Sequence, residues 1–183
     1  MKIAITGGIG SGKSYVCRTL EQRGIRIYDC DSAAKRLMRT SPTLRQQLTE
    51  LIGPDTYDSE GHLNKAEVAR FLLLSEQNAQ AIDAIVHPAV AQDFLQSGYQ
   101  WMECAILFES GFDNLVDKVI VVTAPEEIRI ERVMNRDGIT REKALEWMHH
   151  QWSQEQVVEK SHYEIINDGH PLEPQIEKIL LSL

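Results

Sequence analysis

The chain has 183 residues, 43% hydrophobic and 25% charged, a composition that excludes a largely disordered chain, a collagen-like chain and a coiled coil. Lys and Arg number 19 against 27 Asp and Glu, so the formal net charge is −8. Such an acidic protein is a poor candidate for sequence-independent nucleic-acid binding, and any anionic ligand must be held by a local basic site.

Short apolar segments alternate with helical patterns along the chain. Strands are predicted over 2–6, 25–28, 101–108, 118–123 and 163–166. Helices are predicted over 13–23, through most of 32–98, after Pro125, in two pieces over 140–161, and over 171–183. The strands are mainly apolar rather than alternating apolar and polar, which indicates a parallel sheet covered on both faces. The predicted fold is therefore a three-layer α/β fold with a five-stranded parallel sheet.

Two helical insertions interrupt this alternation. The segment 32–98 holds about 60 helical residues between the second and third strands, far more than a crossover needs, so it is predicted to be a subdomain. A smaller insertion, 129–161, follows the fourth strand. The core then consists of 1–31, 99–128 and 162–183.

The cysteines and the N-terminus bear on the compartment. Cys17, Cys30 and Cys104 are widely spaced and form no CxxC pair, which argues against a disulfide framework and a cysteine zinc site. The first apolar run is too short for a signal-peptide core, and no run approaches the roughly 18 residues of a spanning helix. We expect a cytoplasmic protein with no membrane partner.

The strongest signal is the segment GGIGSGKS at 7–14, which matches G-x-x-x-x-G-K-[ST] between a predicted strand and a predicted helix. The glycines let N–H groups converge on phosphate oxygens, and the helix adds the positive end of its dipole. Lys13 is placed to reach the β- and γ-phosphates and the Ser14 hydroxyl to ligate Mg²⁺. The alternative, a glycine-rich turn with a chance lysine, is disfavoured by this context. The ATP-binding residues expected here are Gly8, Gly10, Ser11, Gly12, Lys13, Ser14 and Tyr15.

A nucleotide-binding regulatory switch is the alternative from a different functional class. A GTPase would carry N-K-x-D after a strand, whereas the segment 64–67 reads NKAE and opens a helix. A D-x-x-G match at 58–61 stands almost beside it, although in a GTPase the two motifs follow different strands. A motor ATPase would end its third strand in Asp-Glu, and here a single acid, Glu109, is present. A small-molecule kinase fits better.

The second insertion carries the arginines expected of a kinase lid: Arg129, Arg132, Arg136 and Arg141. The first three lie three and four residues apart, so they share one helix face. Arginine suits phosphate because its planar fork donates in pairs. The alternative is a solvated face whose arginines pair with neighbouring glutamates.

Two carboxylates follow the second predicted strand, Asp29 and Asp31. Ligands of open parallel sheets bind at the carboxyl ends of the strands, so both acids are expected on the phosphate-loop side. One would accept the proton of the acceptor hydroxyl, and the other would orient the acceptor or Mg²⁺-bound water. The alternative is that Asp31 or Ser32 merely caps the following helix.

An ordered set of motifs resembles the dephospho-CoA kinase family almost end to end. The motifs are TGGIGSGKS at 6–14, DCDSAAK at 29–35, GHLNK at 61–65, His87-Pro88 (expected to open a helix), ILFE at 106–109, the lid segment 132–140, Gln151 and IINDG at 165–169. Four residues depart from the family pattern: Tyr15 replaces a small hydroxyl residue, Lys35 a commoner Arg, Glu103 a frequent Asp and Ala105 a frequent Pro. The last two changes weaken any role for Glu103.

The resemblance implies ATP-dependent phosphorylation of the ribose 3′-hydroxyl of dephospho-CoA, with Mg²⁺ as cofactor, 32–98 as the CoA-binding region and 129–161 as the lid. It implies a catalytic set of Asp31 as base, Asp29 as its support, Lys13 and Arg136. Contacts to ATP phosphates are implied for Arg136 and Arg141, and a contact to the adenine edge for Asn167. The acceptor would meet Asp31, Lys35, Lys65, His87 and Glu109. Another small-molecule or nucleoside monophosphate kinase remains the alternative enzyme, and no oligomeric state is predicted.

Overall fold

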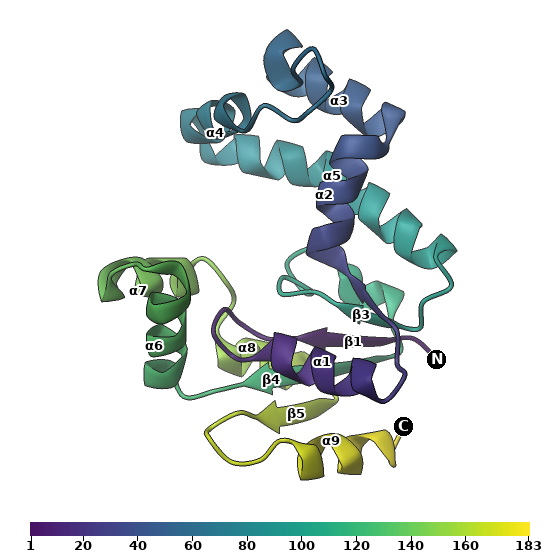
Figure 1. Cartoon of the computed structure of the whole chain (residues 1–183), viewed down its shortest axis with the longest axis vertical. Helices are drawn as coiled ribbons and strands as arrows, with labels where there is room; N and C mark the ends of the chain where they lie inside the picture. Colours follow the sequence, from purple (N-terminus) through teal and green to yellow (C-terminus); the bar gives the residue numbers. More distant parts are fainter. The chain divides into compact units, whose positions relative to one another are not determined.

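The structure contains a five-stranded parallel sheet in the order β2-β3-β1-β4-β5, of which Figure 1 labels β1, β3, β4 and β5. The computed structural model describes residues 1–183. The strands are β1 (Ile3–Thr6), β2 (Ile27–Asp29), β3 (Trp101–Glu103), β4 (Lys118–Thr123) and β5 (Tyr163–Ile166). Ile3 of β1 pairs with Trp101 on one side and with Lys118 on the other. The predicted fold class and parallel sheet are thereby confirmed.

The chain divides into two compact units. The sheet unit comprises Met1–Tyr28 and Tyr99–Leu183, and the inserted unit comprises Asp29–Gly98.

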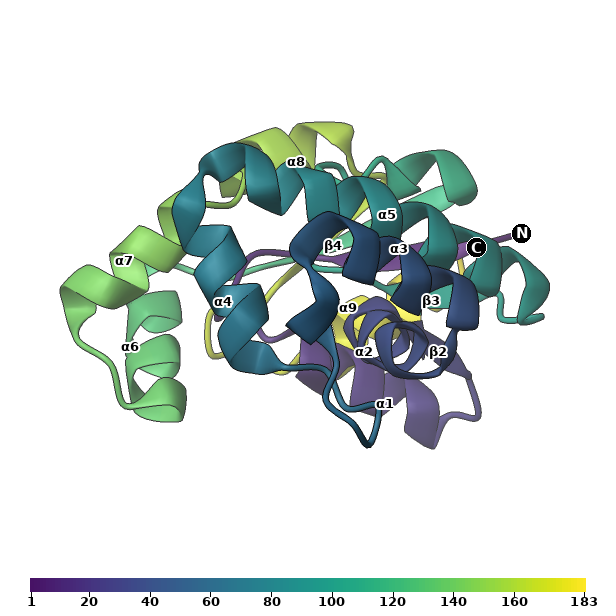
Figure 2. The ribbon, with the colours of Figure 1, turned by 90° about the horizontal axis from the view of Figure 1, so that it is seen from above.

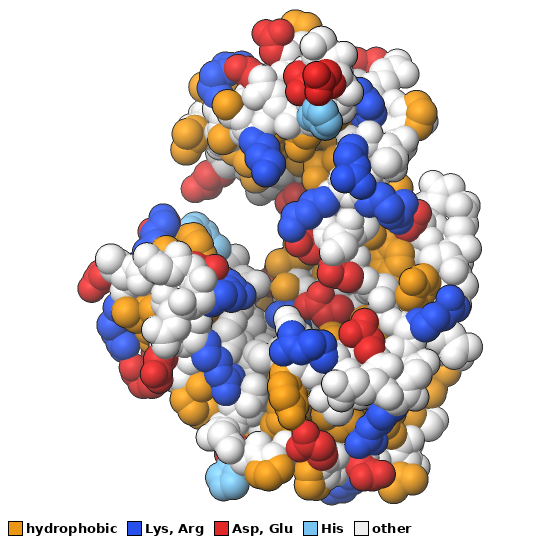
Figure 3. Space-filling model, viewed as in Figure 1, with side chains coloured by type: hydrophobic (Ala, Val, Ile, Leu, Met, Phe, Trp, Pro, Cys, Tyr) orange, Lys and Arg blue, Asp and Glu red, His pale blue; other side chains and the backbone are white.

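On the face drawn in Figure 3, Lys and Arg side chains lie interspersed with Asp and Glu. No helix combines the length and the apolar character that crossing a membrane requires.

The central strand β1 is buried along its whole length because helices cover both faces of the sheet. The helices of the sheet unit are α1 (Lys13–Gln22), α6 (Glu126–Asp137), α7 (Arg141–His149), α8 (Gln154–Lys160) and α9 (Glu173–Leu180), with a 3₁₀ turn η2 (Phe112–Leu115). One face packs on α1 and α9 through Ile3, Ile5, Val16, Leu20, Ile120, Val122, Ile165, Leu172, Ile176 and Ile179. On the other side α8 contacts β4.

The helices α6 and α7 lie side by side in both Figure 1 and Figure 2. A small core of Ile130, Val133, Ala144 and Met148 joins them. Gly138 ends α6 in the left-handed conformation at φ 64°, and the Thr140 side chain caps α7 at the Lys143 N–H. The two helical pieces predicted over 140–161 correspond to α7 and α8.

The third strand is shorter than predicted, because β3 ends at Glu103 and not at 108. In the neighbouring strand β1, only the residues from Ile3 to Ile5 pair with β3. Beyond Glu103 the chain turns, and the Ser110 N–H bonds to the Ile106 carbonyl. Leu107 is fully buried from this turn, so its apolar character reflects packing and not strand pairing.

The inserted unit is built from four α-helices, α2 (Cys30–Thr40), α3 (Pro42–Ile52), α4 (Lys65–Leu74) and α5 (Glu76–Gln96), and a 3₁₀ turn η1 (Pro54–Thr56). Ser41 starts α3 by accepting from the Leu44 N–H at 3.3 Å, and Pro42 occupies the first turn. The buried residues of α3 and α5 are Leu44, Leu48, Val86, Val90 and Phe94.

The expectation that His87-Pro88 opens a helix is wrong. Pro88 lies inside the 21-residue helix α5. Proline within a helix removes one backbone donor and crowds the carbonyl of residue i−4. The buried neighbours Val86 and Val90 pack this stretch in spite of that cost, so tertiary packing overrides the local preference.

Adjacent isoleucines of β5 give a matched test of the core. The Ile165 side chain is 1% exposed in the core below the sheet, whereas Ile166 is 46% exposed. We expect Ile165→Ala to lower the free energy of unfolding by about 3 kcal/mol, and Ile166→Ala by less than about 1 kcal/mol. Urea unfolding of the two variants measures both. Equal losses would contradict this orientation of β5.

Candidate active site

The phosphate loop leads from β1 into α1 and is closely surrounded. Gly10 and Gly12 adopt φ of 79° and 98°, a region that residues other than glycine rarely enter. A Cβ on Gly10 would lie 2.6 Å from the Arg129 carbonyl oxygen, and one on Gly12 would overlap the Asn167 amide. Glycine at both positions therefore permits the turn and the close approach of α6 and the β5–α9 loop.

Three consecutive carbonyls of the loop accept hydrogen bonds from side chains outside it. Arg129 Nε donates to the carbonyl of Ile9 at 3.0 Å. Arg132 Nη1 donates to the carbonyls of Gly10 at 3.2 Å and Ser11 at 3.3 Å. A planar trans peptide places its N–H opposite its carbonyl, so holding the Ile9 and Ser11 carbonyls turns the Gly10 and Gly12 N–H groups the other way, whereas the Ser11 N–H donates to the Gly8 carbonyl at 3.1 Å. The loop is thus preshaped for an anion.

Lys13 lies between a carbonyl and a carboxylate. Its Nζ donates to the carbonyl of Gly7 at 2.7 Å and lies 3.8 Å from Glu103 Oε1. Burial lowers the pKa of Lys13, and the nearby Glu103 charge opposes that shift. Sequence reasoning discounted Glu103 as a departure from the family pattern. Its place at the end of β3 was the signal, because polar groups at the carboxyl ends of neighbouring parallel strands meet at one edge.

The two hydroxyls of the loop differ in surroundings. Ser11 is fully buried, and its Oγ is a buried polar atom without a hydrogen-bond partner. Ser14, in the first turn of α1, is exposed. A buried hydroxyl that lacks a partner is costly, and this one lies close to Gly7, where a Cβ would be 2.9 Å from it.

The four predicted lid arginines divide into two pairs. Arg129 is only 7% exposed and, like Arg132, contacts the phosphate loop. Arg136 instead pairs with Asp137 at 2.7 Å, and Arg141 with Glu127 at 2.6 Å. Contact of Arg136 and Arg141 with ATP phosphates stays a prediction, and it requires phosphate to replace these carboxylates.

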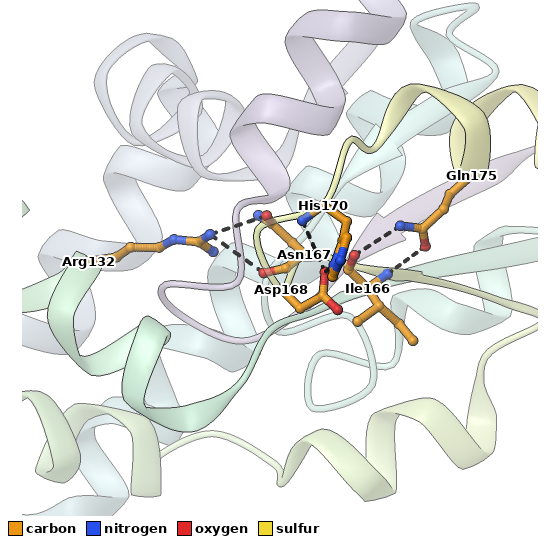
Figure 4. A network of polar contacts seen from close by, with 6 residues as sticks. All are labelled: Arg132, Ile166, Asn167, Asp168, His170 and Gln175. Carbon is orange, nitrogen blue, oxygen red and sulfur yellow. Dashed lines mark hydrogen bonds and ion pairs between the residues drawn. The ribbon is translucent and has the colours of Figure 1, made fainter.

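Asn167, at the end of β5, connects the sheet to the phosphate loop (Figure 4). Its Nδ2 donates to the carbonyl of Ser11 at 2.9 Å, and its Oδ1 accepts from Arg132 Nη2 at 3.2 Å. Its backbone N–H donates to the carbonyl of Thr123 on β4 at 2.7 Å. The side chain thus bonds to both the loop and α6, a role that the sequence did not indicate. Its contact with the adenine edge stays a prediction.

The turn after β5 is held on both sides of Asn167. Gln175 of α9 accepts from the Ile166 N–H at 2.9 Å and donates to the Ile166 carbonyl at 3.0 Å (Figure 4). His170 bonds to Asp168 at 2.9 Å, and this contact lowers the pKa of Asp168. These contacts fix the backbone that carries the Asn167 amide.

Glu109 and Tyr15 also bond within the sheet unit. Glu109 Oε1 accepts from the backbone N–H of Trp152 at 3.1 Å, beside the stacked rings of Trp152 and Phe108. Tyr15, 44% exposed, donates to Glu173 Oε1 at 2.7 Å, and this bond raises the pKa of Tyr15. An acceptor-binding role for Glu109 stays a prediction.

The two aspartates after the second strand have different local roles. Asp29 caps α2, because its carboxylate accepts from the Ser32 N–H at 3.0 Å and from the Ser32 hydroxyl at 2.7 Å. The alternative that Asp31 or Ser32 supplies the cap is therefore wrong. Asp31, in the first turn of α2, has a side chain 72% exposed and forms an ion pair with Lys35.

The other predicted acceptor residues lie further along the inserted unit. Lys65 is exposed as the first residue of α4. His87 lies inside α5, where its Nε2 is 3.5 Å from Asp83. Asp29, Asp31, Lys35, Lys65 and His87 all belong to this unit.

Comparison with known proteins gives the family. A family model described as dephospho-CoA kinase matches residues 1–173. A dephospho-CoA kinase of Porphyromonas gingivalis is 44% identical, covering 97% of this chain and 92% of its own length. One from Bacteroides fragilis strain YCH46 is 40% identical, covering 100% and 93%.

Solved structures agree with this result. A Thermus thermophilus protein superposes with a TM-score of 0.84 at 29% identity, covering 100% of this chain and 97% of its own. The dephospho-CoA kinase from Campylobacter jejuni has a TM-score of 0.71 at 19% identity, with the same coverage, and a likeness at that identity bears on the fold alone. This chain belongs to the dephospho-CoA kinase family.

Proposed function

We propose that this chain transfers the γ-phosphoryl group of ATP to the ribose 3′-hydroxyl of dephospho-CoA, giving CoA and ADP in the cytoplasm. Membership of the family establishes a kinase that phosphorylates dephospho-CoA with ATP in CoA biosynthesis. The observation that carries the proposal is the phosphate loop, whose carbonyls are held by Arg129 and Arg132 and whose Gly7 carbonyl accepts from Lys13. The chain that contains this loop matches the family model over 1–173. The choice of the 3′-hydroxyl rests on the family resemblance.

The phosphate loop would hold the triphosphate. Its N–H groups and the positive end of α1 provide donors and partial charge for the phosphate oxygens. Lys13 would exchange the Gly7 carbonyl for the β- and γ-phosphates, while Glu103 keeps the ammonium near the edge of the sheet. The positive field is local, so it coexists with a net charge of −8.

Asp31 would accept the proton of the attacking hydroxyl. Its carboxylate is free of the helix cap, which Asp29 supplies, and is therefore available to substrate. Asp31 raises the pKa of Lys35 by hydrogen bonding, so Lys35 stays charged beside it. Asp29 supports Asp31 by fixing the start of α2, and Lys35 is placed to contact an anionic acceptor.

The residues present fit Mg²⁺ as cofactor. No group of three or more His, Cys, Asp and Glu side chains forms a metal cage. Mg²⁺ in phosphoryl-transfer sites keeps waters and substrate phosphate oxygens among its ligands, so it needs no all-protein cage, and the Ser14 hydroxyl in the first turn of α1 would be one protein ligand. When bound, the ion neutralises charge on the β- and γ-phosphate oxygens.

Replacing Ser14 tests this assignment. We expect Ser14→Ala to raise the Mg²⁺ concentration for half-maximal activity by roughly tenfold or more, because the protein ligand is lost. Initial rates at fixed ATP and varied MgCl₂ measure the change, with Ser182→Ala as the control at the far end of the chain. An unaltered Mg²⁺ requirement would show that Ser14 is not the ligand.

The acceptor is tested by a panel of substrates. We expect stoichiometric ADP release with dephospho-CoA and none with AMP, CMP or shikimate. Mass spectrometry of the product should locate the new phosphate on the ribose 3′-oxygen. Turnover with AMP or CMP instead would support the nucleoside monophosphate kinase alternative. Slow hydrolysis that no acceptor changes would support the regulatory switch.

A further inference from the structure

Ile9, in the phosphate loop, forms hydrogen bonds through both of the peptide groups that flank its Cα. The Ile9 N–H donates to Gln151 Oε1 at 2.8 Å. The Ile9 carbonyl accepts from Arg129 Nε at 3.0 Å. These two peptide planes flank a single Cα, so the two contacts together restrain both rotatable bonds at that residue.

The two side chains that bond to Ile9 come from different elements. Arg129 projects from the buried face of α6. Gln151 lies in the linker after α7, directly before Trp152, whose N–H bonds to Glu109 at 3.1 Å. A Cβ on Gly8 would collide with the Arg129 guanidinium and would lie 3.5 Å from Gln151 Oε1. Both groups therefore lie against Gly8, and a larger residue there would have to displace the Arg129 guanidinium.

The burial of Arg129 is costly, which argues that its position matters. The residue is 7% exposed, and burial lowers the pKa of its guanidinium, opposed by the charges of Glu126 and Glu155. Its Nε donates to the carbonyl of Ile9. An apolar residue would fill such a site at lower cost if packing were its sole purpose.

We propose that Gln151 and Arg129 are positioning residues for phosphoryl transfer, which hold the two peptide groups of Ile9 so that the loop is shaped before the triphosphate arrives. Such preorganisation avoids ordering the loop at the moment of binding, and it fixes the direction of the Gly10 N–H, which shares its peptide plane with the Ile9 carbonyl. The inference rests on the proposed function only in that this loop binds ATP.

Substitutions that keep the approximate shape of the side chain test the Gln151 and Arg129 contacts one at a time. Gln151→Leu removes the acceptor, while Gln151→Glu keeps an oxygen at the same place. Arg129→Met removes the donor, while Arg129→Gln keeps an N–H at the position of Nε and removes the charge. Arg23→Met, at the opposite end of α1 from the loop, is the control.

The measurements are the KM for ATP, kcat with dephospho-CoA, ADP affinity by calorimetry without acceptor, and amide exchange at Ile9 by NMR of the full chain. We expect Gln151→Leu and Arg129→Met each to weaken ADP binding and raise the KM for ATP by about tenfold. Exchange at Ile9 should accelerate in Gln151→Leu and stay slow in Gln151→Glu. Arg129→Gln should recover most of the loss seen in Arg129→Met.

Three results would overturn the proposal. One is wild-type ADP affinity and KM in Gln151→Leu and Arg129→Met with only the melting temperature lowered, since that would be a structural role. Another is Arg129→Gln as impaired as Arg129→Met, since Arg129 would then act through charge. The third is unchanged Ile9 exchange in Gln151→Leu. If either apolar variant does not fold, Gln151→Glu and Arg129→Gln decide against the wild type: slow Ile9 exchange in Gln151→Glu and near wild-type ADP affinity in Arg129→Gln support the proposal, and fast exchange or weak ADP binding overturns it. Neither readout needs an acceptor, so failure of dephospho-CoA as substrate leaves this test intact.

Discussion

Asp31→Asn is expected to lower kcat with dephospho-CoA by about 100-fold or more while ATP binding is retained. The amide keeps the size of the side chain but cannot take the proton of the acceptor hydroxyl. The cap of α2 is unaffected, because Asp29 supplies it through the Ser32 N–H. Initial rates and calorimetric ATP titration measure the two effects separately.

Two variants serve as controls for Asp31. Asp29→Asn keeps a capping oxygen, since Asn and Asp cap equally well, so it isolates the charge of Asp29 from its structural role. Asp55→Asn changes an exposed acid of the 3₁₀ turn in the same unit and should leave kcat unchanged. Normal turnover in Asp31→Asn would remove Asp31 from the chemistry.

Lys13→Met is expected to lower kcat/KM for ATP by about 1,000-fold, the upper range for losing one preorganised donor to a developing charge. The loss has two parts. The ammonium no longer reaches the phosphates, and the Glu103 carboxylate loses the Lys13 charge 3.8 Å away, so it repels the triphosphate more strongly.

The double variant Lys13→Met/Glu103→Gln separates these parts. Removing the repelling carboxylate should restore about tenfold of the lost kcat/KM, so the two changes should not be additive. Lys178→Met, an exposed lysine of α9, is the control. A double variant no better than Lys13→Met would mean that Glu103 exerts no repulsion on the nucleotide.

The phosphate loop and the parallel sheet could be predicted because their signals are local. Buried parallel strands need unbroken apolar runs, and the loop needs glycines at fixed spacing before a helix. The prediction made the third strand too long, 101–108 instead of Trp101–Glu103, because it also relied on a local apolar run. An apolar run indicates burial, and Leu107 is buried from a turn, so the end of β3 depends on the short partner β1 and not on its own residues.

The arginines illustrate what a pattern cannot resolve. Helical spacing placed Arg129, Arg132 and Arg136 on one face, but the first two bond to loop carbonyls and Arg136 pairs with its neighbour Asp137. Carbonyl acceptors occur at every residue, so no residue type marks the partners of Arg129, Arg132 or Asn167. Only the fold identifies them.

The contacts to the phosphate loop have a consequence for tolerance to substitution. Arg129, Arg132 and Asn167 all bond to backbone carbonyls, so they recognise the path of the loop and not its side chains. Ile9 could therefore change to another apolar residue without losing a single one of these bonds. Arg129, Arg132 and Asn167 have no such freedom, because each side chain must place its N–H groups within hydrogen-bond distance of a fixed carbonyl. Variation should be tolerated at Ile9 and resisted at Arg129, Arg132 and Asn167, which lie far along the chain from the phosphate-loop segment 7–14.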